Sequence, residues 1–360
     1  MSEEPVIQRV EVSFVGAPPV RQVARAGEVM KAIRFNRYGS PDVLSLEDVD
    51  MPAVGDDDVL VRVKAAAVSP LDVRTMTGTP YFMRLLCGLP RPRPIGLGGE
   101  MAGCVEAVGR NVTRFRPGDE VYGGRGMAPT ARSAAFAEYA SLPQDGMVAK
   151  KPANLSFEEA AAMPVSALSA VQALRDKGRI MPGHKVLVNG AGGGAGTFTV
   201  QLAKVYGAEV TGVCGTHNVD MVRSIGADHV VDYTRDDITG TGRRYDLMID
   251  MVGNHPLPVI RRLLTPNGVF VAVGGPLKGM WIRPLLGPLK LLVLSPLIGQ
   301  RLAPIVAKAS GDDLDLLRKH AEAGKIAPVI DRTYALSAVP DAIRYLDKGH
   351  ARGKVVITVS

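Results

Sequence analysis

The segment from Lys185 to Tyr206, KVLVNGAGGGAGTFTVQLAKVY, constrains the fold more than any other part of the chain. It starts as a short apolar run typical of a buried strand, passes through a glycine-rich turn and becomes helical from about Ala195. Phe198, Leu202 and Val205 follow the spacing i, i+4, i+7, which forms one apolar face on a helix. A strand, a tight turn and a helix in this order predict a unit of an α/β fold with a parallel sheet.

The turn between that strand and helix carries the pattern G-x-G-x-x-G with alanine in the first position. Its residues are Ala191, Gly192, Gly193, Gly194, Ala195 and Gly196. Gly193 lacks a Cβ, so the backbone can approach a pyrophosphate, and Gly196 lets the helix pack closely on the strand. The helix N-terminus adds free N–H groups and a positive dipole end. Because the motif follows an expected strand and opens an expected helix, we expect it to bind a dinucleotide; the alternative is a plain strand-to-helix turn.

Composition excludes several other classes of protein. At 360 residues, with 46% apolar and 22% charged residues, two ordinary globular domains are expected. The formal charge is +7, but lysine and arginine are spread along the chain, so nucleic-acid binding is not expected. Cys87, Cys104 and Cys214 share no C-x-x-C spacing, which indicates a reducing compartment, here the cytoplasm, and argues against a cysteine zinc cluster. The first residues lack a signal-peptide pattern, and no apolar run is long enough to span a membrane.

The pattern along the chain divides into a β-rich part and an α/β part. Residues 1–29 are expected to be an N-terminal extension, since the first clear strand is 30–35. Further strands are expected over 59–66, 101–108, 120–122 and 135–140. Ser156 and Glu159 then form a capping box, and a second helix is expected near 166–176. Beyond it, strands over 185–190, 209–214, 229–232, 246–250 and 269–274 alternate with helices near 195–206, 218–225 and 256–264, which predicts a parallel sheet with right-handed crossovers.

Two later segments complete the chain. Residues 281–304 are apolar but interrupted by prolines, and we expect a buried helix–turn segment there, with a lid over an apolar pocket or a membrane-touching surface as alternatives. The last fifty residues return to a helix over 314–323, a turn and two strands, the second over 354–359.

Several sequence motifs stand in one order along the chain. They are RPGDEVY at 116–122, AAMPVSAL at 161–168, the glycine turn, GADHVVDY at 226–233 and GKVV at 353–356. With them, residues 30–360 resemble the medium-chain dehydrogenase/reductase superfamily, most of all its zinc-independent quinone oxidoreductase (zeta-crystallin-like) branch. The resemblance implies a GroES-like catalytic domain formed by 30–156 and 310–360, a Rossmann dinucleotide-binding domain over 157–309, an active site between them, and a homodimer.

The residues at the family's zinc positions predict that no zinc is bound. Zinc-dependent members need three protein ligands. Ser69 occupies the place of their cysteine, Gly99 replaces their histidine, and the third position falls near 163–165, which offers no thiolate. Without a metal to stabilise an alkoxide, an electron-poor acceptor is expected: a quinone or the β-carbon of an α,β-unsaturated carbonyl.

The resemblance and the strand pattern also predict which residues bind the cofactor. The second parallel strand is followed by Gly215, Thr216, His217 and Asn218. No carboxylate stands there to bond a ribose 2′-hydroxyl, so NADPH is expected in preference to NADH. Tyr233 and Lys354 match family positions near the adenosine phosphate; the alternatives are a packing tyrosine and a solvated lysine. Val252 and Gly274 lie at expected strand ends and should border the nicotinamide.

The residues that perform the chemistry are the least constrained by the sequence. Ser69 is a candidate donor to the substrate or ribose, or a satisfied loop hydroxyl. Asp72 is a candidate orienting group, although a turn-stabilising role is preferred. Tyr81 is a candidate proton donor or, preferably, part of a pocket wall, and Glu100 is a candidate partner of an arginine in the cleft. The leading hypothesis is an NADPH-dependent reductase of quinones or enones. Its alternatives are a weakly catalytic NADPH-binding redox sensor or partner-binding protein, and an alcohol dehydrogenase with displaced zinc ligands.

Overall fold

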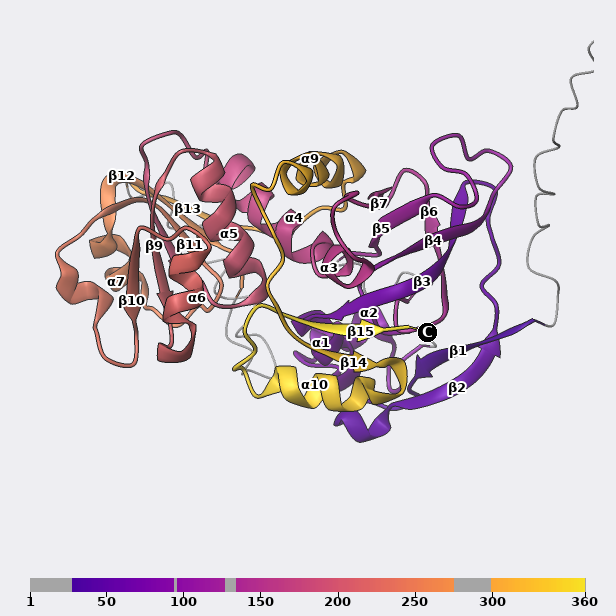
Figure 1. Cartoon of the computed structure of the whole chain (residues 1–360). Helices are drawn as coiled ribbons and strands as arrows, with labels where there is room; N and C mark the ends of the chain where they lie inside the picture. Colours follow the sequence, from indigo (N-terminus) through magenta and orange to yellow (C-terminus); the bar gives the residue numbers. More distant parts are fainter. Residues whose placement is uncertain (1–27, 94–95, 127–133, 275–298, 360) are drawn as a thin grey trace, which may run out of the picture.

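The computed structural model describes residues 28–93, 96–126, 134–274 and 299–359. These residues form two large sheets, one mostly antiparallel and one parallel, which lie side by side along the long dimension of the molecule (Figure 1). The parallel sheet comes from residues 185–304, whereas the other sheet takes its strands from residues 58–150 and from residues 330–358.

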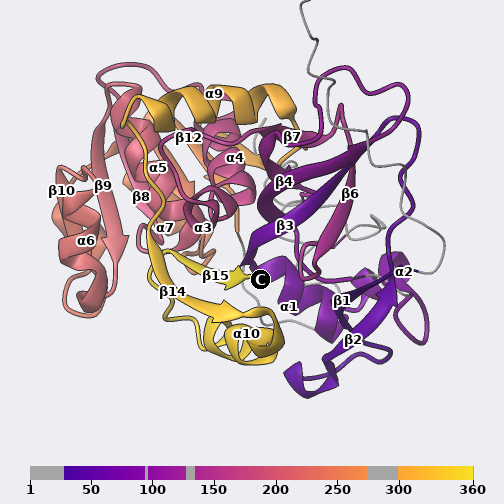
Figure 2. The same ribbon diagram turned by 45° about the vertical axis from the view of Figure 1, so that its right-hand side comes forward.

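The mostly antiparallel sheet has seven strands. Its order is β14-β15-β3-β4-β5-β7, with β6 also paired to β3. The strands are β3 (Asp58–Val68), β4 (Glu100–Val108), β5 (Glu120–Gly124), β6 (Tyr139–Pro143), β7 (Met147–Lys150), β14 (Ile330–Ala335) and β15 (Lys354–Thr358). Since β15 pairs antiparallel with β3 and parallel with β14, the end of the chain lies inside this sheet rather than at its edge. Figure 2 shows β14, β15 and the last helix, α10 (Val339–Asp347), beside the N-terminal elements.

Smaller elements surround this sheet. A two-stranded antiparallel sheet consists of β1 (Val29–Arg34) and β2 (Ser45–Asp50). Two short helices, α1 (Pro70–Thr77) and α2 (Phe82–Cys87), follow β3. Ile33, Val61, Met101 and Val355 are buried in one cluster with Val339 and Ile343 of α10, so the two ends of the chain share a core.

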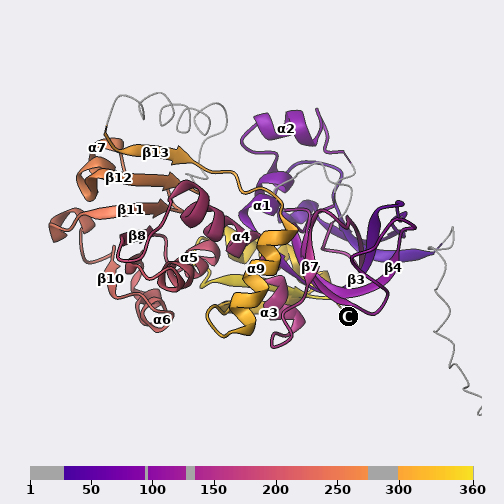
Figure 3. The ribbon, with the colours of Figure 1, turned by 90° about the horizontal axis from the view of Figure 1, so that it is seen from above.

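The parallel sheet has the strand order β10-β9-β8-β11-β12-β13, and every neighbouring pair is parallel. Its elements are β8 (Lys185–Asn189), α5 (Gly194–Val205), β9 (Glu209–Cys214), α6 (Val219–Ser224), β10 (His229–Asp232), β11 (Tyr245–Asp250), α7 (Leu257–Leu263), β12 (Leu264–Ala272) and β13 (Arg301–Pro304). The order reverses between β8 and β11, which is where doubly wound sheets bind ligands, outside the carboxyl ends of the strands. Seen from above, the arrows of β11, β12 and β13 point toward the N-terminal elements (Figure 3).

One hydrophobic core joins the two sheets through the helices between them. It includes Ala65 of β3, Tyr122 of β5, Met163, and Phe198 of α5. The helices α3 (Phe157–Ala161) and α4 (Pro164–Gln172), with a π-helical turn over Ala173–Lys177, pass between the sheets, and α9 (Gly311–Glu322) packs over β7 and α4. The buried Tyr122 hydroxyl donates a hydrogen bond of 2.6 Å to the Leu314 carbonyl oxygen and fastens α9 to β5.

The structure confirms a GroES-like sheet beside a Rossmann-like parallel sheet, and it corrects three details. The strand expected over 135–140 is β6, Tyr139–Pro143, because only that stretch pairs with β3. The helix α10 was not predicted. Residues 301–304, expected in a helix–turn segment, form β13 at the edge of the parallel sheet. The expectations for 1–27 and 281–298 lie outside the described residues.

Candidate active site

The glycine turn joins β8 to α5 and leaves open space on one side. Gly190 has φ of 87°, a left-handed conformation that favours glycine. An ideal Cβ on Gly196 would lie 2.1 Å from the Gly190 carbonyl oxygen, so the helix packs too closely on the strand for any side chain. An ideal Cβ on Gly193 would meet, among described atoms, only that same oxygen at 3.7 Å. Because the first N–H groups of α5 also lack intrahelical acceptors, the turn fits a pyrophosphate.

The same turn touches the other sheet. The Gly353 N–H, just before β15, donates a hydrogen bond of 2.9 Å to the Gly192 carbonyl oxygen, and Gly193 and Gly353 form a parallel bridge. The side chain of Lys354 passes beside Gly194, where an ideal Cβ would lie 2.8 Å from the Lys354 Cδ. A dinucleotide at the turn would therefore lie at the junction of the two sheets.

Polar groups mark the point where the strand order reverses. Asn189, the last residue of β8, donates from Nδ2 to Asp250 Oδ1 and Asn254 Oδ1, each at 2.9 Å. The same Asp250 oxygen accepts the N–H of Val252 at 2.9 Å, and the Asp250 carbonyl oxygen accepts the N–H of Gly274 at 3.1 Å. Val252 and Gly274, expected beside the nicotinamide, thus lie together at the carboxyl ends of β11 and β12; their contact with a cofactor stays a prediction.

The segment after β9 forms a small polar cluster with the end of β10. The Thr216 hydroxyl, expected to donate to a cofactor, donates to Asp232 at 2.6 Å. The Tyr233 side chain is 61% exposed and lies over Gly215, where an ideal Cβ would be 3.2 Å from its hydroxyl oxygen. Asn218 is buried, and its Nδ2 lies 3.2 Å from His217 Nε2.

Three residues of this cluster were not identified from the sequence. Asp232, the last residue of β10, brings a carboxylate to Thr216 from the neighbouring strand; Arg235 lies 3.7 Å from Asp232, and the His350 ring meets the His217 ring edge-on at 6.2 Å. Asp232 is the last residue of β10 and Arg235 follows three residues later, so their place at the carboxyl end of a parallel strand was the available signal.

A buried ion pair stands beside the glycine turn. The Lys354 ammonium donates to Glu100 Oε1 and, at 3.3 Å, to the Val68 carbonyl oxygen, and Glu100 Oε2 accepts the Val165 N–H at 2.8 Å. Glu100 is fully buried and Lys354 is 4% exposed. Burial raises the pKa of the Glu100 carboxyl, while Lys354 and the Val165 N–H oppose that rise. Lys354 is therefore not a solvated lysine, and the partner of Glu100 is this lysine rather than an arginine.

Ser69 and Asp72 lie together at the start of α1. Asp72 is fully buried, and its Oδ2 accepts the Ser69 hydroxyl at 2.9 Å and the Ser69 N–H at 2.8 Å. Its other oxygen accepts the Gly98 N–H at 2.9 Å. Asp72 thus holds the first turn of α1 against the segment that leads into β4, and the Ser69 hydroxyl has a protein acceptor.

Tyr81 belongs to a separate group of contacts. It precedes α2, and the Arg84 guanidinium carbon lies 4.7 Å from the centroids of both the Tyr81 and Tyr38 rings. This sandwich is a cation–π arrangement. The role of Tyr81 as a proton donor stays a prediction.

The three thiols are expected to react slowly in the native protein. Burial raises the pKa of Cys87, Cys104 and Cys214, the last to about 11. A thiol with a raised pKa is protonated at neutral pH, and the thiolate is the reactive form. Relative to an ordinary thiol near pKa 8.5, the thiolate fraction of Cys214, whose pKa is about 11, falls by about 300-fold. Reaction with a disulfide reagent should be slow at pH 7.5 and fast after unfolding; one rapidly reacting native thiol would contradict this and favour the redox-sensor alternative.

Neither a metal cluster nor a membrane span is found in the parts of the chain that the structure describes. There, no group of three or more histidine, cysteine, aspartate or glutamate side chains is arranged to hold a metal ion. Among those same residues, no helix has the length and apolar character needed to cross a membrane.

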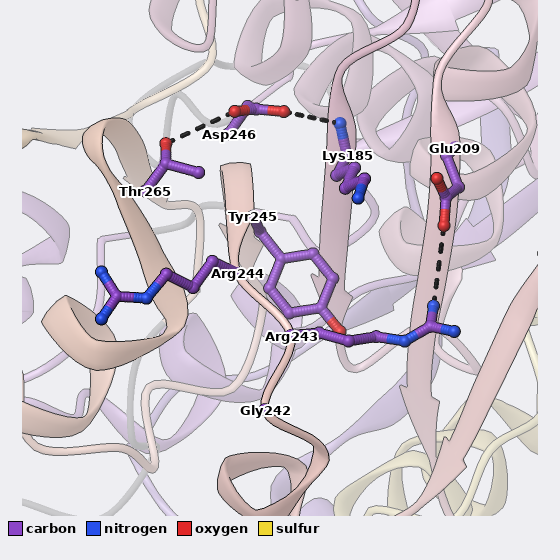
Figure 4. Close-up of a pocket in the computed structure, with 8 residues that line it drawn as sticks. All are labelled: Lys185, Glu209, Gly242, Arg243, Arg244, Tyr245, Asp246 and Thr265. Atoms are coloured by element: carbon purple, nitrogen blue, oxygen red, sulfur yellow. Dashed lines mark hydrogen bonds and ion pairs between the residues drawn. The ribbon is translucent and has the colours of Figure 1, made fainter.

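A hollow of ≈ 620 Å³ lies at the opposite, amino edge of the parallel sheet (Figure 4). Its lining comes from the starts of β8, β9, β11 and β12 and from the loop before β11: Lys185, Glu209, Gly242, Arg243, Arg244, Tyr245, Asp246 and Thr265. Several of these groups bind one another; Asp246 accepts the Lys185 N–H at 2.9 Å, and Arg243 lies 3.6 Å from Glu209. Since ligands of such sheets bind at the carboxyl edge, we place the candidate active site at the glycine turn and not here.

Comparison with known proteins covers nearly the whole chain. Residues 55–153 match the alcohol dehydrogenase GroES-like domain, and residues 225–357 match a zinc-binding dehydrogenase domain. The chain is 33% identical to a 2-methylene-furan-3-one reductase from Solanum lycopersicum and 32% identical to an NADPH-dependent alkenal/one oxidoreductase, chloroplastic, from Arabidopsis thaliana. Each alignment covers 91% of this chain and 79% of the relative.

Solved structures agree with the sequence relatives. The quinone oxidoreductase from Coxiella burnetii superposes with a TM-score of 0.81 at 28% identity, covering 92% of this chain and all of that chain. Both domain types are matched, the strand order is that of a dinucleotide-binding sheet, and relatives exceed 30% identity over most of their length. The protein therefore belongs to the medium-chain dehydrogenase/reductase superfamily of oxidoreductases, in its quinone oxidoreductase branch.

Proposed function

We propose that this protein is an NADPH-dependent reductase that transfers hydride to a quinone or to the β-carbon of an α,β-unsaturated carbonyl compound, without zinc. The observation that carries the proposal is the contact between the glycine turn and the start of β15, through Gly353 and Gly192. This contact supports a binding mode in which the parallel sheet binds the dinucleotide and the nicotinamide end of the dinucleotide faces residues of the other sheet. The names of the quinone and alkenal/one oxidoreductase relatives support the same class of acceptor.

The cofactor supplies the hydride, and the protein supplies binding, orientation and exclusion of water. Ala191, Gly192, Gly193, Gly194, Ala195 and Gly196 would hold the pyrophosphate. Gly215, Thr216, His217, Asn218 and Tyr233 would surround the adenosine ribose. Val252 and Gly274 would border the nicotinamide, and Lys354 would act by fixing the position of the turn. Ser69, held by Asp72, would donate from its hydroxyl when a ligand oxygen replaces its present acceptor, and Tyr81 remains the proposed wall or proton donor.

A preference for NADPH is supported by the basic groups near Thr216. Arg235 is 3.7 Å from Asp232, and His217 and His350 are in ring contact, so these three basic side chains would lie near a 2′-phosphate bound beside Thr216. The carboxylate of Asp232 opposes this preference, but two threonine hydroxyls and the Arg235 guanidinium already engage it. We therefore propose that NADPH is preferred over NADH by a modest factor.

Two further proposals concern assembly and location. The parallel sheet ends at β13, and no second partner strand is found for β13 among the described residues. An open sheet edge of this kind is suited to pairing with a second copy, which supports a homodimer. From the cysteine usage we propose a cytoplasmic location. The Arabidopsis thaliana relative is chloroplastic, so an organellar location is the alternative. Fractionation of the native source distinguishes the two.

Turnover is tested by loss of absorbance at the reduced-nicotinamide band with an ortho-quinone and with a linear enone. NADPH and NADH are compared in parallel, each with and without a metal chelator. Chelator-insensitive oxidation that is faster with NADPH is expected. Absence of turnover with every quinone and enone, despite NADPH binding, would contradict the reductase and favour the NADPH-binding sensor. Loss of activity on chelation, restored by zinc, would instead favour the alcohol dehydrogenase with displaced ligands.

A further inference from the structure

Arg125 is a buried cation whose donors are not used by the protein. It directly follows β5 and is 7% exposed. Its Nε, Nη1 and Nη2 atoms are each buried, and none has a hydrogen-bond partner within the described part of the chain. A guanidinium stays protonated in proteins, and a buried charge without hydrogen bonds is unfavourable. Such a group is stable only if something other than these residues accepts its hydrogen bonds.

The backbone places Arg125 next to the polar end of β4. The Gly126 N–H donates to the Gly99 carbonyl oxygen at 3.2 Å, and an ideal Cβ on Gly124 would lie 2.2 Å from that oxygen. The residues on both sides of Arg125 therefore contact Gly99. In the sequence, Gly99 lies between Gly98 and Glu100. The Gly98 N–H donates to Asp72, and the Glu100 carboxylate accepts from Lys354.

A continuous set of contacts joins this position to the glycine turn. The Lys354 side chain lies beside Gly194 and donates to the Glu100 carboxylate. It also donates to the carbonyl oxygen of Val68, which is the residue before Ser69. Ser69 and Gly98 both donate to Asp72. Arg125 thus lies at the end of the series of residues that would face the reactive end of a bound dinucleotide.

The surrounding charges indicate what kind of partner Arg125 awaits. Burial lowers the pKa of the Arg125 guanidinium, and the Asp72 carboxylate opposes this by favouring the charged form. The Asp72 carboxylate already accepts three hydrogen bonds from Ser69 and Gly98. It therefore balances the positive charge of Arg125 electrostatically, while the N–H groups of Arg125 stay without an acceptor among the described residues. The carboxylates of Asp72 and Glu100 offset the cations of Arg125 and Lys354, so the site as a whole has no excess positive charge for a substrate carboxylate. A neutral substrate whose oxygen becomes negative during the reaction fits better.

We propose that Arg125 is a catalytic residue that donates hydrogen bonds to the carbonyl oxygen of the substrate and stabilises the negative charge that develops there. This inference rests on the reductase function proposed above. The β-carbon of an enone, or one oxygen of a quinone, gains a hydride from NADPH, which becomes NADP⁺, and the conjugated π electrons move to the carbonyl oxygen that Arg125 contacts, giving an enolate or a quinol anion. A proton from water then completes the two-electron reduction. Arg125 keeps its proton throughout, and its fixed donors act as an oxyanion site.

The test compares wild type with Arg125→Met and Arg125→Lys, using one ortho-quinone and one neutral enone. Arg125→Met should lower kcat by about 10²-fold, the loss typical for one oxyanion donor, while KM for NADPH stays within about twofold. Arg125→Lys should recover part of kcat because it keeps the charge without the planar donors. Arg110→Met, which removes an exposed guanidinium paired with Asp56, is the matched control and should leave kcat unchanged.

Two readouts do not require turnover. In the presence of NADP⁺, para-nitrophenol should bind to wild type as the coloured phenolate at a pH where the free phenol is largely protonated, and Arg125→Met should abolish this shift. The Tm of Arg125→Met should equal or exceed that of wild type, because the substitution removes an unpaired buried charge.

Several results would overturn the inference. One is an unchanged kcat in Arg125→Met, and another is a loss confined to NADPH affinity, which would place the guanidinium on the cofactor. A large fall in Tm would also overturn it, since the protein itself would then be the partner of Arg125. If wild type reduces no acceptor, the proposed function fails, and the phenolate shift and its loss in Arg125→Met still decide the role of Arg125.

Discussion

Lys354→Met is expected to lower the free energy of unfolding by about 3–5 kcal/mol, the loss typical when one partner of a buried ion pair is removed. Among the residues that the structure describes, the substitution leaves the fully buried Glu100 carboxylate with the Val165 N–H as its remaining hydrogen-bond donor. Urea unfolding at pH 7 measures the effect. Lys204→Met, which breaks the half-exposed pair with Asp228, is the matched control and should cost at most about 1 kcal/mol. Equal losses in the two variants would contradict the importance of burial.

The pH dependence of the same variant follows from the Glu100 carboxyl. Burial already raises its pKa, and removal of Lys354 removes the main opposing effect. A carboxyl whose pKa is higher in the folded than in the unfolded state gives its full contribution to stability below the unfolded pKa, and that contribution is lost as the pH rises through the folded pKa. Lys354→Met should therefore be least stable at neutral pH and above, and should approach wild type on acidification. Adding Glu100→Gln should restore much of the stability at pH 7, because the amide oxygen still accepts the Val165 N–H.

Gly196→Ala and Gly193→Ala are expected to separate folding from cofactor binding. At Gly196 the new methyl would lie 2.1 Å from the Gly190 carbonyl oxygen and 2.9 Å from the Ala191 Cα. Both are backbone atoms, so relieving the clash would require the backbone of the turn to move. We expect a loss of more than about 4 kcal/mol, or failure to fold. Gly193 has φ −87° and ψ 172°, which alanine adopts readily, and its methyl would meet no described atom nearer than 3.7 Å.

Gly193→Ala should consequently fold with a stability within about 1 kcal/mol of wild type. Its methyl should project into the space of the pyrophosphate and weaken NADPH binding by about tenfold or more, equivalent to about 1.4 kcal/mol. Thermal unfolding and NADPH fluorescence titration measure the two effects on the same samples. Unchanged NADPH affinity in Gly193→Ala would show that the cofactor does not approach this face of the turn.

The parallel sheet was predictable from the sequence because its strands are buried on both faces and therefore read as continuous apolar runs, as at Val186–Val188. The strand over 135–140 was misplaced because its position depends on which residues find a partner strand, and the sequence does not show this. Ala137 forms only an isolated bridge to Ala32, while the strand proper begins at Tyr139, where β3 offers a partner. The spacing of Val339, Ala342 and Ile343, all buried in α10, was a usable helical signal that was missed.

The candidate site was predictable only where it is local in sequence. The glycine turn and the segment after β9 are continuous stretches with recognisable patterns. The Glu100–Lys354 pair joins residues 254 positions apart, and no local pattern identifies either as the partner of the other. Arg125 stands between glycines, where its sequence context indicates only a turn, and its significance depends on burial and on the absence of acceptors among the described residues.

The position of β15 between β14 and β3 has a consequence for the order in which the protein folds during synthesis. Residues 185–304 leave the ribosome in one stretch and contain all six strands of the parallel sheet. The other sheet begins to emerge first, and β6 pairs with residues 58–62 of β3, yet residues 65–68 of that same edge have no partner until residues 354–358 have been translated. Because an unpaired strand edge invites association, the nascent N-terminal half is exposed to chaperones or to aggregation for most of translation. The usual vectorial order, in which the N-terminal domain is finished first, is therefore reversed in this chain.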